Sequence, residues 1–234
     1  MVEEIDFETY LSLTKNKFKI FLFDNKKLRN LYKKELKLES NFNFIDLEEL
    51  SKFLDTHIFK IEKIAGKFIK KIYLIMENDL NFQVNICIKK ENLDNLINKK
   101  NLENALTEVK DLFKEHYQQQ TITHMIINNY LINGKNYSSF IDNLRGDNLC
   151  LEINFMSISN HTLFAFDKIL EKYQITISQY LNGNYVKNFF NEENIEMSEM
   201  VYKLRNGYNN NEVILVPKNI ENKGFFEKFF QLFS

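Results

Sequence analysis

A run of apolar and β-branched residues from Thr121 to Ile132 constrains the fold of this chain more than any other stretch. It ends at Asn133-Gly134, a dipeptide typical of tight turns because both residues tolerate positive φ. After a polar loop, residues Leu149–Ile158 mostly alternate between apolar and polar side chains, as expected of a half-buried strand. The sequence therefore predicts two strands joined by a turn and a polar loop.

A helix, a third strand and a short helix are expected to follow. Ser159-Asn160 offers an N-cap, and the apolar positions between Leu163 and Tyr173 share one helical face. Ile175–Tyr180 has the residue types of a strand, and Gly183 precedes a short helical stretch that reaches Phe190. The predicted fold class is α+β.

The N-terminal part of the chain reads as a meander of strands followed by a long helix and another strand. Asp46 is placed as the N-cap of the helix, with Glu49 completing a capping box, and Gly66 as the residue that ends it. The expected elements are strands at Phe7–Leu13, Lys17–Asp24, Leu31–Glu39 and Phe68–Met76 and a helix from Leu47 to Gly66, then a strand at Leu80–Ile88 and a helix at Leu93–His116.

The C-terminal residues 224–234 form the sharpest local pattern. At about 100° per residue, their apolar side chains cover roughly 160° of a helix surface, with Glu227, Lys228 and Gln231 on the other side. Because such an apolar face must be buried, we expect an amphipathic helix lying in the plane of a membrane surface; the alternative is a terminal helix packed on the protein core. The predicted membrane-binding residues are Phe225, Phe226, Phe229, Phe230, Leu232, Phe233 and Lys228.

Composition and motifs argue against several classes of function. Lys and Arg number 31 against 32 Asp and Glu, which gives a net charge of −1 and no electrostatic case for nucleic-acid binding. Basic pairs such as Lys70-Lys71 are interpreted as solvated surface. The four histidines are scattered and no catalytic motif is present, so we expect no enzyme activity, metal or cofactor. Cys87 and Cys150 are interpreted as buried free thiols within strands.

The run THMIINNYLINGKN…RGDNLCLEINFMSISNHTLFAFDKILEKYQITISQYLNGNYVKNFF resembles subdomain 1C, the SHS2 subdomain (strand-helix-strand-strand), of the bacterial cell-division protein FtsA. Gly134, Gly146 and the helix Leu163–Tyr173 stand where that pattern has them. The resemblance implies a partial actin-like (ribonuclease H-like) subdomain 1A. It would comprise residues 1–79 and 174–190, with the SHS2 subdomain inserted at 80–173.

The remaining segments follow from the same comparison. Residues 191–223 are expected to be a linker with a short helix and an extended segment, and residues 224–234 resemble the C-terminal amphipathic helix of FtsA. In that family the first hairpin carries an Asp-Ile-Gly-Ser/Thr loop that approaches nucleotide phosphates. Here Ser12 stands in place of the Asp and Thr14 in place of the Gly. A β-branched residue obstructs close approach to the backbone, so no ATP binding is predicted.

These expectations describe a non-ATPase, FtsA-like cell-division adaptor that is cytoplasmic and peripheral on the inner membrane. Its expected partners are the cytoplasmic membrane surface and bacterial division proteins, with FtsZ as a candidate, and the oligomeric state stays open. One alternative is a membrane-associated assembly scaffold of the PilM type. The other is a cytosolic α+β protein-binding module whose C-terminal helix is structural.

Overall fold

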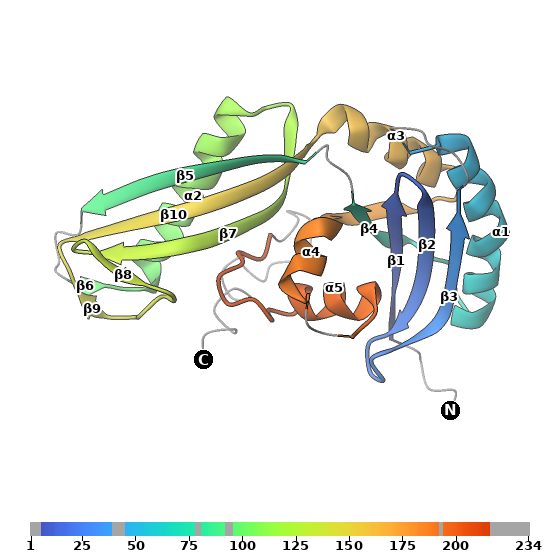
Figure 1. Ribbon diagram of the computed structural model, residues 1–234, viewed down its shortest axis with the longest axis horizontal. Coiled ribbons are helices and arrows are strands. Elements are labelled where there is room, and N and C mark those ends of the chain that lie inside the picture. Colours follow the sequence, from blue (N-terminus) through green and yellow to red (C-terminus); the bar gives the residue numbers. More distant parts are fainter. Residues whose placement is uncertain (1–5, 39–44, 78–80, 92–95, 192–193, 216–234) are drawn as a thin grey trace. The chain divides into compact units, whose positions relative to one another are not determined.

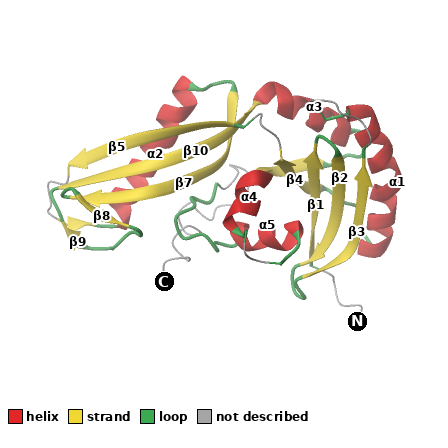
Figure 2. Cartoon of the chain, in the orientation of Figure 1, coloured by secondary structure: helices red, strands yellow, loops and turns green. Residues whose placement is uncertain are grey.

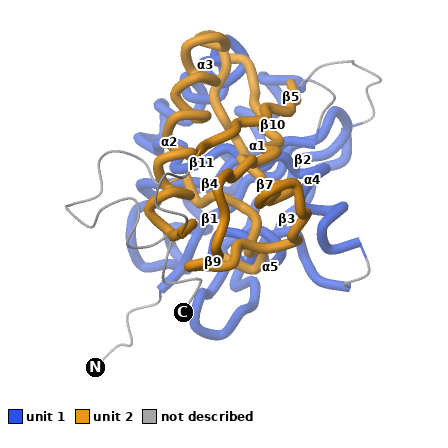
Figure 3. Tube along the Cα trace, turned by 90° about the vertical axis from the view of Figure 1, so that its left-hand side faces the viewer, with its two compact units in different colours: residues 1–81, 160–206 blue, residues 82–159, 207–234 orange. Residues whose placement is uncertain are grey.

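The computed structural model describes residues 6–38, 45–77, 81–91, 96–191 and 194–215 of the 234-residue chain. The chain divides into two compact units, one of residues 1–81 and 160–206 and the other of residues 82–159 and 207–234 (Figure 3). We call them unit 1 and unit 2. Each unit is therefore assembled from segments that are distant in the sequence.

Unit 1 is built on a five-stranded mixed sheet with the order β11-β4-β1-β2-β3 (Figure 1). Strands β1 (Phe7–Thr14), β2 (Lys17–Asp24) and β3 (Arg29–Lys37) form an antiparallel meander, and β4 (Lys71–Glu77) and β11 (Thr176–Asn182) run parallel to β1. Strand β2 runs opposite to the other four strands. The ribonuclease H-like sheet on which actin-like domains are built has this same strand order and these strand directions. The predicted α+β, partial actin-like fold is confirmed.

Helices lie on both faces of this sheet (Figure 2). Helix α1 (Leu47–Ala65) packs on one face, where Phe53 contacts Phe18 of β2 with ring centroids 6.1 Å apart. Helices α4 (Gly183–Phe189) and α5 (Met197–Arg205) cover the other face. The core on that side contains Tyr10, Phe21, Phe23, Ile75, Leu181, Val186, Phe190, Met197, Val201 and Leu204. Alternate residues of one strand therefore pack into the cores on opposite faces of the sheet, as the two-residue period of a strand requires.

The ends of α1 are set by local sequence. The Asp46 carboxylate accepts hydrogen bonds at 3.0 Å from the backbone N–H groups of Glu48 and Glu49, two donors that the first helical turn leaves unpaired. Gly66 ends the helix at φ 69°, in the left-handed region, and its N–H donates to the Glu62 carbonyl. The N-cap residue and the residue that ends the helix are those predicted from the sequence, whereas the Glu49 carboxylate accepts from Lys52 at 2.8 Å.

Unit 2 contains a four-stranded antiparallel sheet with the order β5-β10-β7-β8. Its elements are β5 (Phe82–Glu91), β6 (Leu96–Ile97), α2 (Lys99–His116), β7 (Gln120–Ile132), β8 (Lys135–Tyr137), β9 (Leu144–Arg145) and β10 (Asn148–Ser159). The long elements follow the expected order strand, helix, strand, strand. The prediction that the helix begins at Leu93 is wrong, because the short strand β6 pairs with β9 and Asn98 caps the helix.

One face of the unit 2 sheet is buried under α2. Leu106, Val109 and Phe113 of the helix share a core with the alternate residues of β10, and Phe113 stacks on Phe155 with centroids 4.7 Å apart. The residues of β10 between them point to the other face and are partly exposed: Cys150, Glu152, Asn154 and Met156. We call this second face the open face of unit 2.

Two segments belong to other parts of the molecule than the sequence predicted: the helix expected in the inserted subdomain, and the expected linker. Helix α3 (Asn160–Glu171) belongs to unit 1, since the units divide between residues 159 and 160 rather than after 173. The Tyr173 hydroxyl then donates to Asp55 of α1 at 2.7 Å. Within 191–223, α5 buries Val201 in unit 1. Val213 is buried in unit 2, and its N–H donates to the Met125 carbonyl at 2.8 Å.

Candidate functional site

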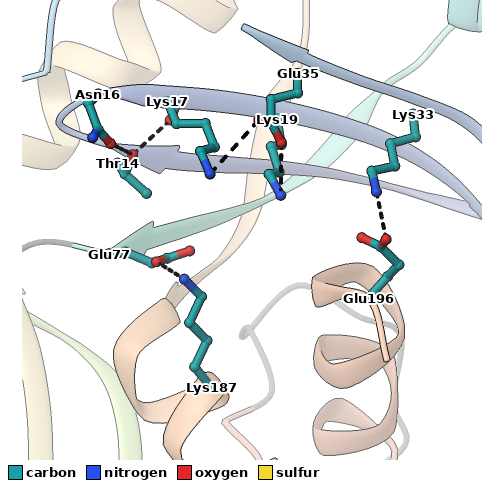
Figure 4. A network of polar contacts seen from close by, with 9 residues as sticks. All are labelled: Thr14, Asn16, Lys17, Lys19, Lys33, Glu35, Glu77, Lys187 and Glu196. Carbon is teal, nitrogen blue, oxygen red and sulfur yellow. Dashed lines mark hydrogen bonds and ion pairs between the residues drawn. The ribbon is translucent and has the colours of Figure 1, made fainter. Parts of the chain in front are cut away.

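The end of the β1–β2 hairpin is the place where an actin-like domain presents its backbone to nucleotide phosphates. Here Ser12 is buried, and the hydroxyl of Thr14 lies 3.0 Å from the Asn16 side-chain oxygen and 3.1 Å from the Lys17 carbonyl (Figure 4). The Thr14 side chain therefore closes the turn through its own hydrogen bonds. An incoming phosphate would have to displace a side chain where the family pattern has only backbone.

Lysine side chains near this hairpin are already paired with carboxylates. Lys19 lies 3.0 Å and Lys17 3.8 Å from the Glu35 carboxylate, and the hydrogen bond from Lys19 lowers the pKa of Glu35. Across from them, Lys187 of α4 pairs with Glu77 at the end of β4 (Figure 4). A phosphate would have to compete with these carboxylates for each ammonium group.

The hollow beside the hairpin is small. Its volume is about 210 Å³, less than the roughly 300 Å³ at the low end for ligand pockets. Met197 and Met200 of α5 line it. Helix α4 also approaches closely, because a Cβ on Gly183 would lie 2.4 Å from Cγ of Glu77. The hollow is therefore narrow and is lined by side chains of β1, β2, α4 and α5.

A larger groove lies at the other end of β1. Its volume is about 1230 Å³, and its lining comes from the start of β1, the last turns of α1 and the connection from α1 to β4. Two of its aromatic side chains are strongly exposed: Phe59 at 73% and Phe68 at 80%. We call it the Phe59–Phe68 groove. Exposed aromatic rings of this kind are enriched at protein-binding surfaces.

The Phe59–Phe68 groove is lined by three carboxylates and four lysines. Among its acidic residues, Glu8 pairs with Arg205 at 2.6 Å and Glu62 accepts the Ile69 N–H at 3.1 Å. Asp6 accepts the Asn25 amide at 3.2 Å. The lysines in the lining are Lys63, Lys67, Lys70 and Lys71. The lining therefore carries four lysines and three carboxylates, with Glu8 paired to Arg205 and the Lys67 ammonium lying 4.9 Å from the centroid of the Phe7 ring.

Two buried polar atoms of the groove lining lack a hydrogen-bond partner among the described residues: Oγ1 of Thr9 and Oδ1 of Asn25. Thr9 is only 1% exposed. An unpaired buried polar atom costs about 1–3 kcal/mol and calls for an explanation such as a bound ligand or water. Lys70 and Lys71 are exposed, as the sequence interpretation has them, but the groove that they line could not be predicted because separate segments of the chain form it.

The predicted membrane-binding residues Phe225, Phe226, Phe229, Phe230, Leu232, Phe233 and Lys228 lie outside the described residues. Among the helices that the structure describes, none has both the length and the apolar character needed to cross a bilayer. The described residues contain no cluster of three or more His, Cys, Asp or Glu that could bind a metal ion. His57 instead contacts the Tyr32 hydroxyl at 2.7 Å, and His124 pairs with Glu212 at 2.6 Å.

The cysteine interpretation needs correction. Cys87 is exposed and Cys150 is partly exposed, so neither is a buried thiol. Both lie on the open face of unit 2, since Cys150 stands opposite Lys89, and Cys87 opposite Glu152, in the pairing of β5 with β10. The structure keeps them as free thiols, as predicted, but brings them together.

No protein-family model matches this sequence, and no curated protein matches it. Among solved structures, the chain is similar to part of the PilM–PilN type IV pilus biogenesis complex, at 8% identity and a TM-score of 0.48, over 78% of this chain and 49% of that one. It is also similar to the cytoplasmic domain of EpsL, an inner membrane component of the type II secretion system of Vibrio cholerae. There the identity is 9% and the TM-score 0.36, over 77% and 57% of the two chains.

A third similar structure is a Bacteroides thetaiotaomicron protein of unknown function with an actin-like ATPase fold, at 10% identity and a TM-score of 0.32. That match covers 82% of this chain and 60% of the other. The chain thus spans about half to three-fifths of the length of these structures. The assignment to the actin-like class rests on the order and directions of the strands in unit 1.

Proposed function

We propose that this chain is a non-catalytic adaptor of actin-like fold that binds protein partners at the cytoplasmic face of a membrane. The observation that supports the proposal is the hairpin of unit 1, where the Thr14 hydroxyl is hydrogen-bonded within the turn and nearby lysines are paired with carboxylates. An actin-like body that does not bind nucleotide can still act as a rigid scaffold for partner proteins. Function is thereby assigned from a site rather than from the fold alone.

Membrane attachment is proposed through residues 224–234. Full burial of one Phe side chain is worth about 1.5–3 kcal/mol and burial at an interface less, whereas ordering a free segment costs about 1–2 kcal/mol per residue. One such helix therefore binds reversibly, and several on a shared assembly bind firmly. Within this class, an FtsA-like role in cell division is the first candidate and a PilM-like scaffold is the second.

The partner-binding surface that we assign is the Phe59–Phe68 groove. Its exposed aromatic rings and its four lysines favour a peptide segment of a partner protein with apolar side chains flanked by carboxylates. Partner contacts through unit 2, the part of the chain whose sequence resembles the SHS2 subdomain, are also proposed. Unlike the contacts through unit 2, binding at the groove can be tested directly, because its exposed aromatic rings and lysines define which ligands should bind there.

The groove can be tested with an anionic apolar dye, 8-anilinonaphthalene-1-sulfonate, and a peptide of alternating Phe and Asp. We expect both to bind the intact chain and to bind the variants Phe68→Ala and Lys70→Glu at least several-fold more weakly. Lys114→Glu, an exposed substitution on α2, serves as the matched control. Equal binding by all variants would remove the groove from the proposal.

Membrane attachment can be tested by flotation with vesicles that contain anionic lipid. The intact chain should float and the chain lacking residues 224–234 should stay in solution. Flotation of both, or of neither, contradicts the membrane part of the proposal, and the second outcome favours the cytosolic binding module. Localisation in the native cell then separates the candidates, because a division adaptor concentrates at midcell and a pilus scaffold does not.

A further inference from the structure

Cys87 and Cys150 are 63 residues apart in the sequence, yet their sulfur atoms lie 2.8 Å apart. Strands β5 and β10 bring them together. Because Glu152 stands opposite Cys87 and Lys89 opposite Cys150, the two cysteines are diagonal neighbours on the open face of unit 2. Side chains at diagonal positions can touch, and here they do.

Both thiols are accessible from solvent. Cys87 is exposed, and Cys150 is partly exposed beside it. A disulfide bond requires a sulfur–sulfur distance of about 2.05 Å, so the present contact needs to shorten by less than about 1 Å. The two side chains are therefore already positioned for bond formation, on a surface that small oxidants can reach.

We propose that Cys87 and Cys150 form a reversible oxidation site, which a low-molecular-weight disulfide such as oxidised glutathione converts into an intramolecular disulfide. In the first step, the thiolate of the more exposed Cys87 attacks the oxidant, forms a mixed disulfide and releases one molecule of reduced glutathione. In the second, the Cys150 thiolate attacks the Cys87 sulfur and releases the other. Two thiols are oxidised, and one oxidised glutathione is reduced to two thiols.

The surroundings agree with this order of steps. Burial, together with the hydrogen bond to Cys87, raises the pKa of the Cys150 thiol to about 11, which makes it a poor first nucleophile in neutral solution. Once Cys87 carries glutathione, the adjacent Cys150 reacts within the same molecule, where its effective concentration is high. Exposed disulfides are also the more easily reduced ones, so the bond is expected to be reversible.

The bond would join the edge strand β5 to β10, which pairs with β7 on its other side. Helix α2 and strand β7 lie in the sequence between the two cysteines, so the closed loop contains most of unit 2. Closing a long loop restricts the unfolded chain and thereby stabilises the folded one. We expect the oxidised protein to melt several degrees above the reduced protein.

The test uses the full chain treated with oxidised glutathione, followed by blocking of the remaining thiols and intact mass spectrometry. We expect a loss of about 2 Da with no blocked thiol and no glutathione attached, and full reversal by dithiothreitol. Two blocked thiols, glutathione on both cysteines, or a covalent dimer would each overturn the proposal.

The control is Cys87→Ser, which changes an exposed side chain and leaves one thiol. This variant should keep the circular dichroism spectrum of the intact chain, gain no internal bond, and show no rise in melting temperature on treatment. A rise equal to that of the unsubstituted chain would show that the stabilisation comes from another source, and would contradict the assignment of this pair.

Discussion

Arg205, at the end of α5, connects this helix to the sheet of unit 1. Its guanidinium donates to the Glu8 carboxylate at 2.6 Å and to the Tyr73 hydroxyl at 2.5 Å, and it reaches Gln179 of β11 at 3.3 Å. Both side chains of the ion pair are 19% exposed. At this degree of burial, the partner left behind by a single substitution cannot be fully solvated, which makes the pair costly to break.

Arg205→Met should therefore lower the free energy of unfolding by about 3–5 kcal/mol, measured by urea denaturation. Lys52→Met is the control, because its ion pairs with Glu48 and Glu49 lie on the exposed surface of α1 and their loss should change the free energy of unfolding little. Adding Glu8→Gln to Arg205→Met should recover part of the loss. Equal effects of the two single substitutions would contradict a buried role for Arg205.

His57 makes stability depend on pH. Burial, and then the nearby Lys60 and Lys34, lower its pKa below the ordinary value of 6.5. The unfolded chain therefore takes up this proton at a higher pH than the folded protein does, and folding is favoured while His57 is neutral. Its contribution is complete above about pH 6.5 and is lost as the pH falls through the lower, folded pKa.

Urea denaturation at a series of pH values between about 7.5 and 5 checks this, since stability should decrease with falling pH and His57→Gln should reduce the slope. An NMR titration of the His57 ring should give a pKa below that of the unfolded chain. A pKa above 6.5 in the folded protein would contradict the account.

At the scale of elements, the packing of α4 on β4 depends on Gly183. A Cβ there would lie 2.4 Å from Cγ of Glu77 and 3.1 Å from Cγ2 of Ile75. Gly183→Ala should therefore destabilise unit 1 by about 1–3 kcal/mol through overpacking, as measured by thermal or urea unfolding. Combining it with Glu77→Ala removes the closest atom and should recover part of the lost stability. If stability does not recover, the contact with Glu77 is not the cause of the loss.

Elements whose signals are local could be predicted from the sequence. The ends of α1 followed from Asp46 and Gly66, and the β1–β2 hairpin from the residues between its strands, because caps and tight turns are decided within a few residues. The strands β6 and β9 could not be predicted, since each has two residues and exists only through pairing with the other. For the same reason, the residue at which α2 begins could not be predicted.

Site features that depend on distant segments were harder to predict. The replacement of Gly by Thr14 in the hairpin could be read from the sequence because it concerns one turn, and its effect on nucleotide binding stays a prediction. The exposure of Cys87 was missed, although its alternation with Ile86 and Ile88 placed it on the polar side of β5. The Phe59–Phe68 groove, and the contact between the two sulfurs, required the tertiary fold, since their residues meet only when separate segments pair.

At the scale of the whole molecule, the two units are built from interleaved segments. The chain enters unit 2 after residue 81, returns to unit 1 after residue 159 and reaches unit 2 again after residue 206. In the last segment Glu212 bridges to Ile126 of β7, and its carboxylate binds His124. Both units therefore depend on residues from the C-terminal third of the chain, including α5 in unit 1.

The protein that we propose is an actin-like scaffold that does not bind nucleotide. Titration of the intact chain with ATP and Mg²⁺ in a calorimeter tests this most directly. Because the Thr14 side chain is hydrogen-bonded within its own turn, and Lys19 and Lys187 are paired with Glu35 and Glu77, we expect no saturable binding heat at ATP concentrations up to about 1 mM. Such a result would limit the binding free energy to roughly 4 kcal/mol. Saturable binding with a micromolar Kd would contradict it.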